Sequence, residues 1–197
     1  AGDIVARRVA DKLAGSAYSK LPGIVENKPG AGGRIALDTL KQAAPDGATL
    51  CMTPYSATAI YPHVYTKMSY DAEKDFVAVS TSAIIHHGLA VGPLVPASVK
   101  TVKDFLAWAK ANPKDASYGS PAAGATPHFI GVMLGRAAGV ALNHVAYRGG
   151  APALQDVMGG QIPASINVLS EVIPQIAGGK LRVAIGALDR GGRGEAD

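Results

Sequence analysis

Ser120 is the residue that most invites a catalytic interpretation, because it stands between a short apolar stretch and a helical pattern. A hydrolase nucleophile elbow has glycines two residues before and after its serine, where this chain has Tyr118 and Ala122. Pro121 also fits poorly into the strained turn of such an elbow. Cys51 has only apolar neighbours, which favours an inert buried thiol. The sequence therefore predicts no enzyme nucleophile at either position.

The five histidines do not have the spacing of a metal site. His86 and His87 are adjacent, so on a strand they would face opposite sides of the sheet. His63, His128 and His144 show no ligand spacing either. We interpret all five as ordinary surface or core histidines and predict no metal site.

A glycine-rich segment, Gly30–Gly33, has two of the three glycines of a dinucleotide-binding fingerprint. Ile35 occupies the third position, and no Gly-Lys-Ser or Gly-Lys-Thr follows as a phosphate-binding loop would require. Turn and helix-start chemistry accounts for the segment, so we predict no cofactor.

The loop Ser120–Thr126 consists of small residues and leads into a helical pattern. Such a loop presents unpaired backbone N–H groups at the positive end of a helix, which suits a carboxylate or a phosphate. The hydroxyls of Ser120 and Thr126 can donate further hydrogen bonds. An ordinary strand-to-helix connection capped by Thr126 explains the same residues equally well, and the loop chemistry alone leaves both interpretations open.

Composition excludes several classes of protein. The 197 residues are 48% hydrophobic and 17% charged, against about 25% charged in an average globular domain, so the chain can bury a core and is not disordered. Its longest apolar stretch, 83–97, is interrupted by prolines, a glycine and histidines and is too short for a membrane span. The net charge of +4 is spread along the chain, which argues against a nucleic-acid partner.

Apolar periodicity predicts strands alternating with helices, and hence parallel sheets with helices on both faces. Asp3 is expected to cap a first helix, and a domain boundary is expected near residue 97. Expected strands are 24–26, 48–52, 76–80, 84–91, 116–119, 144–147, 162–168 and 181–187; expected helices begin near residues 3, 35, 101, 127, 150 and 174.

Several motifs, taken in order along the chain, resemble the Bug family, the extracytoplasmic solute receptors of tripartite tricarboxylate transporters. The resemblance implies an α/β fold of the type II periplasmic-binding-protein kind, with two domains and a ligand cleft between them. It is carried by Val25–Gly33, Pro45–Leu50, Tyr70-Asp71, Tyr118–Ser120, His144–Leu154, Gly159–Gln161 and Ala177–Arg182.

The resemblance also implies that the chain is truncated at both ends. Residues 1–97 would form the first domain without its first strand and its C-terminal return segment. Residues 98–188 would form the second domain, and residues 189–197 the start of the crossover back to the first.

By the same resemblance, ligand-binding residues are expected in both domains. Relatives often have a serine after the loop glycine, where this chain has Ala125 followed by Thr126, so it stays open which hydroxyl meets the ligand. The expected ligand-binding residues are Asp3, Tyr55, Ser56, Thr58, Ser120, Ala123, Gly124, Ala125, Thr126, Tyr147, Gly149 and Asn167.

The family implies a periplasmic solute-binding protein and not an enzyme. It would capture a mono-, di- or tricarboxylic acid and deliver it to the membrane subunits of the transporter, as a monomer when full-length. Two alternatives stay open: a binding protein that signals to a sensor kinase, and an enzyme acting on small acids.

Overall fold

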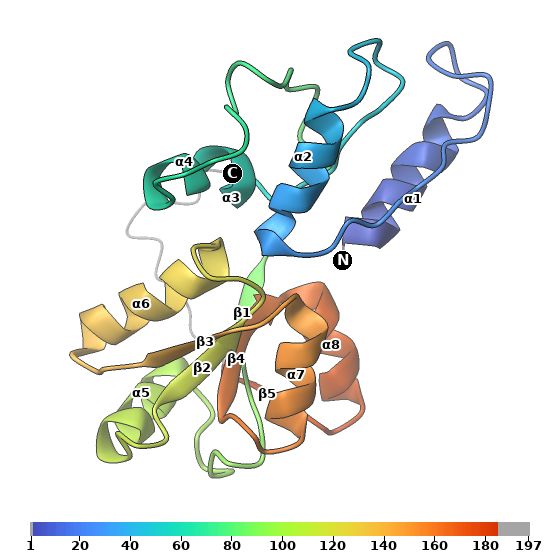
Figure 1. Ribbon diagram of the computed structural model, residues 1–197. Helices are drawn as coiled ribbons and strands as arrows, with labels where there is room; N and C mark the ends of the chain where they lie inside the picture. The colour runs from blue at the N-terminus through green and yellow to red at the C-terminus, as the bar shows by residue number, and fades with distance from the viewer. Residues whose placement is uncertain (1, 185–197) are drawn as a thin grey trace, which may run out of the picture.

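The computed structural model describes residues 2–184 of the chain, and within them it forms two units joined near residue 86 (Figure 1). We call residues 2–86 the first unit and residues 87–184 the second unit. The second unit is built around a five-stranded sheet, whereas the first is built of helices and extended segments.

The sheet of the second unit is mixed, not purely parallel as expected. Its order is β3-β2-β4-β1-β5; β2 runs parallel to β3 and β4, and β1 runs antiparallel to β4 and β5. The chain enters the sheet from the first unit along β1, so this strand points opposite to the strands that follow it. The strands are β1 (His87–Val91), β2 (Ser117–Ser120), β3 (Asn143–Ala146), β4 (Ala164–Val168) and β5 (Arg182–Ala184).

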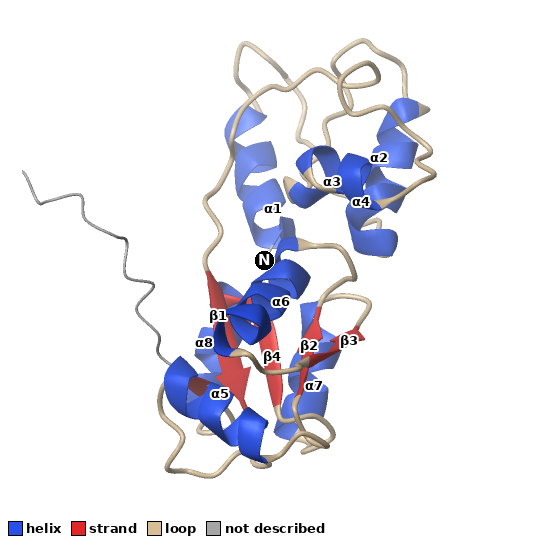
Figure 2. Ribbon diagram, turned by 90° about the vertical axis from the view of Figure 1, so that its left-hand side faces the viewer, coloured by secondary structure: helices blue, strands red, loops and turns tan. Residues whose placement is uncertain are grey.

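Helices cover both faces of this sheet (Figure 2). Alternation along β1 places Leu89 and Val91 on one face, in a core with Phe105 and Tyr118. Ala90 lies on the opposite face, in a second core to which both helices there contribute. The covering helices are α5 (Val102–Ala111) and α6 (Thr126–Ala138) on the first face, and α7 (Gly150–Met158) and α8 (Leu169–Ala177) on the second.

In the second unit, α5 begins where local chemistry predicts, whereas α8 does not. Thr101 and Asp104 form a capping box that starts α5, where the sequence predicts a helix. Pro174, predicted to begin a helix, instead lies inside α8. Because Pro174 has no N–H, α8 loses one internal hydrogen bond there, and its burial against the sheet through Val172 outweighs that loss.

The first unit contains short helices around a cluster of apolar side chains. Its largest members are Tyr61 and Tyr70, and Ala122 and Ala125 of the second unit pack into the same cluster. Asp3 does not cap the first helix as predicted, because that helix begins at Gly2. The elements are α1 (Gly2–Leu13), the 3₁₀ turn η1 (Ala31–Gly33), α2 (Arg34–Lys41), α3 (Ser56–Ala59) and α4 (Tyr61–Val64).

The strands predicted at 24–26, 48–52 and 76–80 do not form. A strand requires a hydrogen-bonded neighbour, and within residues 2–184 no segment pairs with these three. Several of their apolar side chains are consequently open to solvent, with Ile24 exposed to 91% and Val77 to 90%. The composition of these segments is typical of strands, but the described chain supplies no partner for them.

β1 pairs with β4 and so belongs to the sheet of the second unit, and the domain boundary near residue 97 stays a prediction. Of the predicted strand 181–187, residues 182–184 form β5, and the remainder lies outside the described residues together with the predicted crossover 189–197. No helix in the described part of the chain has the length and apolar character to cross a membrane.

Candidate ligand-binding site

Three helices of the second unit begin at the sheet edge that faces the first unit (Figures 1 and 2). The helices α6, α7 and α8 follow the carboxyl ends of β2, β3 and β4, which is the edge where open α/β sheets bind ligands. None of the three has a side-chain hydrogen bond to its N-cap position. The positive ends of three helix dipoles therefore gather at this edge.

The loop before α6 carries three backbone donors at this edge. Gly124 adopts a positive φ of 76°, which only glycine adopts without strain. Its N–H donates to Nδ1 of His128 at 3.0 Å. Among the described residues, the next backbone donors, those of Ala125, Thr126 and His128, have no hydrogen-bond partner. These three N–H groups form the candidate anion site.

Ser120, predicted to contact the ligand, is fully buried. Its Oγ donates to the carbonyl oxygen of Ala122 at 3.1 Å and lies 2.7 Å from Nε2 of His144. With its hydrogen directed to Ala122, the hydroxyl accepts from the imidazole and is engaged on both sides. Ser120 thus stabilises the loop from inside, and its closeness to a histidine does not make a catalytic dyad that substrate can reach.

The two histidines beside this loop form a stacked pair. The ring centroids of His128 and His144 lie 4.0 Å apart, with an interplanar angle of 25°. Burial, and then the neighbouring His128, lowers the pKa of His144 to about 4, and burial also lowers the pKa of His128. Both imidazoles are therefore neutral at pH 7. The sequence interpretation of ordinary histidines missed this arrangement.

Two tyrosines of the first unit reach across to the same loop. Oγ1 of Thr126 donates to the hydroxyl of Tyr55 at 2.9 Å, and the hydroxyl of Tyr65 donates to the carbonyl oxygen of Ala123 at 2.9 Å. Arg34, at the start of α2, stacks over the ring of Tyr65 with its guanidinium carbon 4.0 Å from the ring centroid. Tyr65 and Arg34 were not predicted from the sequence.

The other predicted residues of the first unit are placed less directly. Ser56 is buried at the start of α3, and Oγ1 of Thr58 donates to the carbonyl oxygen of Tyr55 at 3.1 Å. The carboxylate of Asp3 accepts from Nε of Arg7 at 3.0 Å and from Nδ2 of Asn27 at 2.7 Å. These two contacts, that of Arg7 first, hold the pKa of Asp3 below its usual value, so it stays an anion engaged within the first unit.

In the second unit, Tyr147 and Gly149 make hydrogen bonds to neighbouring parts of the same unit. The hydroxyl of Tyr147 donates to Oδ2 of Asp156 at 2.6 Å, and burial followed by this carboxylate raises the pKa of Tyr147 to about 12. The N–H of Gly149 donates to the carbonyl oxygen of Pro121 at 3.0 Å. Tyr147 therefore faces α7, while Gly149 links the loop before α7 to the loop before α6.

Asn167, near the end of β4, is fully buried beneath the start of α7. Its Nδ2 donates to Oγ of Ser165 at 2.8 Å, but its Oδ1 has no hydrogen-bond partner in the described part of the chain. That oxygen lies against Gly150, where an added Cβ would approach it to 2.6 Å. Asn167 thus lies at the same edge of the sheet as the starts of α6, α7 and α8, and its Oδ1 is an unused acceptor within the described residues.

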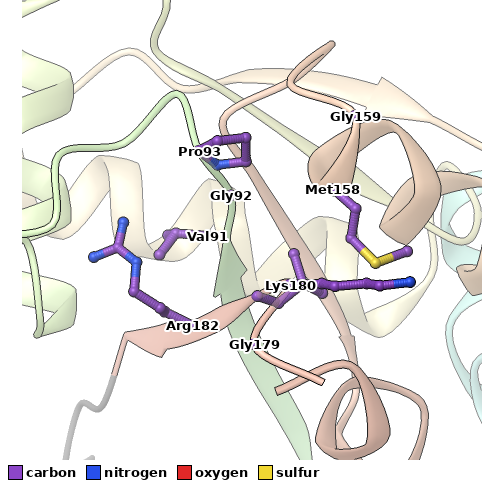
Figure 3. Close-up of a pocket in the computed structure, with 9 residues that line it drawn as sticks. Val91, Gly92, Pro93, Met158, Gly159, Gly179, Lys180 and Arg182 are labelled. Carbon is purple, nitrogen blue, oxygen red and sulfur yellow. The ribbon is translucent and has the colours of Figure 1, made fainter. Parts of the chain in front are cut away.

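A pocket lies away from the candidate site, at the opposite edge of the sheet (Figure 3). It has a volume of about 560 Å³ and is lined by residues such as Met158, Lys180 and Arg182. The guanidinium of Arg182 donates hydrogen bonds to the carbonyl oxygens of Val95, Pro96 and Val99. No predicted ligand-binding residue lines this pocket. Within residues 2–184 no group of three or more His, Cys, Asp or Glu side chains is arranged to hold a metal ion.

Comparison with known proteins identifies the family. The sequence model of the tripartite tricarboxylate transporter family receptor matches residues 5–193. Over 184 residues the chain is 36% identical to the UPF0065 protein in the gbd 5′ region of Cupriavidus necator, covering 92% of this chain and 53% of that protein. It is 30% identical to protein BugT of Bordetella pertussis, covering 95% of this chain and 57% of BugT. The chain thus spans about half the length of these curated relatives.

Solved structures agree with this assignment. A structure described as a periplasmic transporter superposes with a TM-score of 0.80 at 38% identity, covering 92% of this chain and 60% of that one. MatC from Rhodopseudomonas palustris, solved with bound malate, has a TM-score of 0.81 at 25% identity, with coverages of 96% and 63%. An adipate-bound R. palustris protein has a TM-score of 0.80 at 29% identity, with coverages of 92% and 59%.

These neighbours and the periplasmic binding protein BugD share the mixed α/β fold of this chain. The fold is therefore that of a periplasmic binding protein. With a family match over nearly the whole chain and relatives that agree in sequence and in structure, this chain belongs to the tripartite tricarboxylate transporter receptor family.

Proposed function

We propose that this chain belongs to a periplasmic receptor that binds a small carboxylate between its two units and delivers it to the membrane subunits of a transporter. The observation that carries the proposal is the set of unpartnered N–H groups of Ala125, Thr126 and His128 at the start of α6. Structural neighbours solved with malate and with adipate support a carboxylate as the ligand.

Backbone donors suit this ligand because they carry no charge that would require compensation when the site is empty. A carboxylate oxygen accepting two or three N–H groups at a helix start gains charge-assisted hydrogen bonds and the favourable end of the helix dipole. Gly124, without a side chain, lets Tyr65 and Val64 of the first unit pack close to the loop. The guanidinium of Arg34, held on the ring of Tyr65, adds a positive field on the first-unit side.

Delivery requires that the loaded receptor differ from the empty one. Tyr55 and Tyr65 already connect the first unit to the loop before α6, so a ligand seated there would add its own contacts to an existing junction. Closure of two units about a ligand is a common switch in binding proteins. A membrane partner would then distinguish the closed form, and the receptor would act as a monomer.

Calorimetric titration of the full-length protein with mono-, di- and tricarboxylates tests this proposal, with adipate and malate in the panel. We expect at least one carboxylate to bind and the matching amide, which lacks the charge, to bind at least about tenfold more weakly. Silence across the acids, with a sugar or an amine binding instead, contradicts the proposal. Turnover of an acid during the titration would instead favour an enzyme.

A further inference from the structure

We propose that His128 is a positioning residue of the carboxylate site, and that the loop Ser120–Thr126 keeps its binding shape only while the His128 imidazole is neutral. The receptor would then release its solute as the pH falls. This inference rests on the proposed function and adds a form of regulation to it.

The contact that carries the inference is the hydrogen bond from the Gly124 N–H to Nδ1 of His128, at 3.0 Å. His128 lies at the third position of α6, so its side chain reaches back over the helix start, as the Glu or Gln of a capping box does. Gly124 is buried and bent into a positive φ, and the bond closes the turn just before Ala125 and Thr126. Their free N–H groups depend on that turn for their position.

His128 is itself held in place by the second unit. It stacks on His144, whose Nε2 contacts Oγ of Ser120 at 2.7 Å. The hydroxyl of Tyr118 donates to the backbone carbonyl oxygen of His128 at 2.7 Å. The imidazole therefore has little freedom to rotate away from Gly124.

The titratable and charged groups around His128 come from several elements. His144 faces it from β3 and Tyr118 from β2, whereas Tyr65, next to α4, and Arg34 of α2 face the same loop from the first unit. Burial lowers the pKa of His128, and no carboxylate among the described residues contributes to that shift. An added proton would thus meet a second imidazole and no compensating anion.

Protonation must place the new hydrogen on Nδ1, because the neutral ring that accepts from Gly124 already carries its hydrogen on Nε2. Two donors would then face each other, and the Gly124 N–H would have to turn away. Burial lowers the pKa of His128 from its ordinary value of 6.5, so this change belongs below that pH. A long-range attraction of the imidazolium for the carboxylate acts in the opposite sense, and the experiment decides between the two.

The test measures adipate and malate affinity of the full-length protein between pH 7.5 and 5 for three proteins. His128→Asn places an amide oxygen at the Nδ1 position and does not titrate, so it also reports the solute's own titration. His63→Asn, at an exposed histidine outside the site, is the matched control. We expect His128→Asn to bind within about threefold of wild type at pH 7.5, and the wild type and His63→Asn to lose about tenfold more affinity than His128→Asn by pH 5.

A second measurement does not depend on any ligand. Nitrogen-15 NMR of the unliganded protein should show neutral His128 with its hydrogen on Nε2, and the Gly124 amide signal should shift with the same midpoint as His128, below pH 6.5. The inference is overturned if neutral His128 carries its hydrogen on Nδ1, or if the Gly124 amide signal does not change as His128 titrates. A wild-type affinity that rises, relative to His128→Asn, as the pH falls also overturns it. Absence of carboxylate binding at every pH overturns the proposed function instead, and the NMR result then stands alone.

Discussion

The hydroxyl of Tyr65 donates a hydrogen bond to the carbonyl oxygen of Ala123, 58 residues further along the chain. Tyr65 belongs to the first unit and Ala123 to the loop before α6, so this bond spans the junction where we propose the solute to bind. The ring of Tyr65 also supports the guanidinium of Arg34. One side chain therefore joins the guanidinium of Arg34 to the candidate anion site.

Replacing Tyr65 with Phe should weaken carboxylate binding about two- to tenfold. The change removes one hydrogen bond across the junction, of about 0.5 to 1.5 kcal/mol, and keeps the ring under Arg34. Tyr18→Phe is the matched control, because the Tyr18 hydroxyl donates to the carbonyl oxygen of Gly47 within the first unit. Calorimetry measures both. Tighter binding by Tyr65→Phe would mean that the bond competes with the solute.

Gly124→Val should reduce both stability and affinity. Gly124 has a φ of 76°, so a β-branched residue there costs about 1 to 3 kcal/mol of backbone strain, and its side chain would meet Tyr65. Gly139→Val, at the other end of α6, has a similar φ of 63° with open space around it, and therefore reports the strain alone. Thermal unfolding should fall for both variants, whereas affinity should fall only for Gly124→Val. Equal affinities would clear the loop of a role in binding.

Ser120 and Thr126 should separate into a structural and a binding role. Ser120→Ala leaves His144 and the Ala122 carbonyl without their partner, so we expect a loss of about 1 to 3 kcal/mol in the free energy of unfolding with little change in affinity. Thr126→Val keeps the shape but removes the contact with Tyr55, and should weaken affinity more than stability. Denaturant unfolding and calorimetry together distinguish them. The reverse pattern would identify Ser120 as the hydroxyl that meets the solute.

Stability should decline in mild acid because of His144. Its folded pKa of about 4 lies below the ordinary value of 6.5, so the unfolded chain binds a proton first as the pH falls. The contribution of neutral His144 to the free energy of unfolding is fully present above pH 6.5 and is lost between pH 6.5 and 4. The free energy of unfolding falls there by up to about 1 kcal/mol per pH unit. Urea unfolding at stepped pH measures the slope. His144→Gln should flatten it, whereas a slope unchanged from wild type contradicts the assignment.

The sequence predicts the second unit well because its strands are short apolar segments bounded by turns. The strands predicted at 116–119, 144–147 and 162–168 each form within two residues of their predicted start. The strands predicted in the first unit do not form, for a physical reason. An extended segment becomes a strand only beside a partner, and the pattern of Val77 and Val79 records strand character without saying where that partner lies.

For the candidate site, sequence reasoning identified the loop but not what holds it. Small residues before a helix predict unpaired N–H groups, which the described part of the chain has at Ala125 and Thr126. Metal-ligand spacing gives no reason to select His128. A polar side chain at the third helical position, four residues after a glycine, is itself a signal, since it can reach back to the glycine N–H. Tyr65 had no such local signal, because its contact depends on how the two units meet.

The pairing of β1 bears on how the protein folds during synthesis. Within the described chain β1 pairs with β4 and β5, both made much later, and His87 finds its partner only at Val168. Until β4 has been synthesised, the strand that ends up between β4 and β5 has no neighbour, and Leu89, Ala90 and Val91 stay open to solvent. Contacts so distant in sequence slow folding and prolong the time during which aggregation-prone intermediates expose apolar surface. A nascent chain halted before β4 should therefore need a chaperone to remain unaggregated.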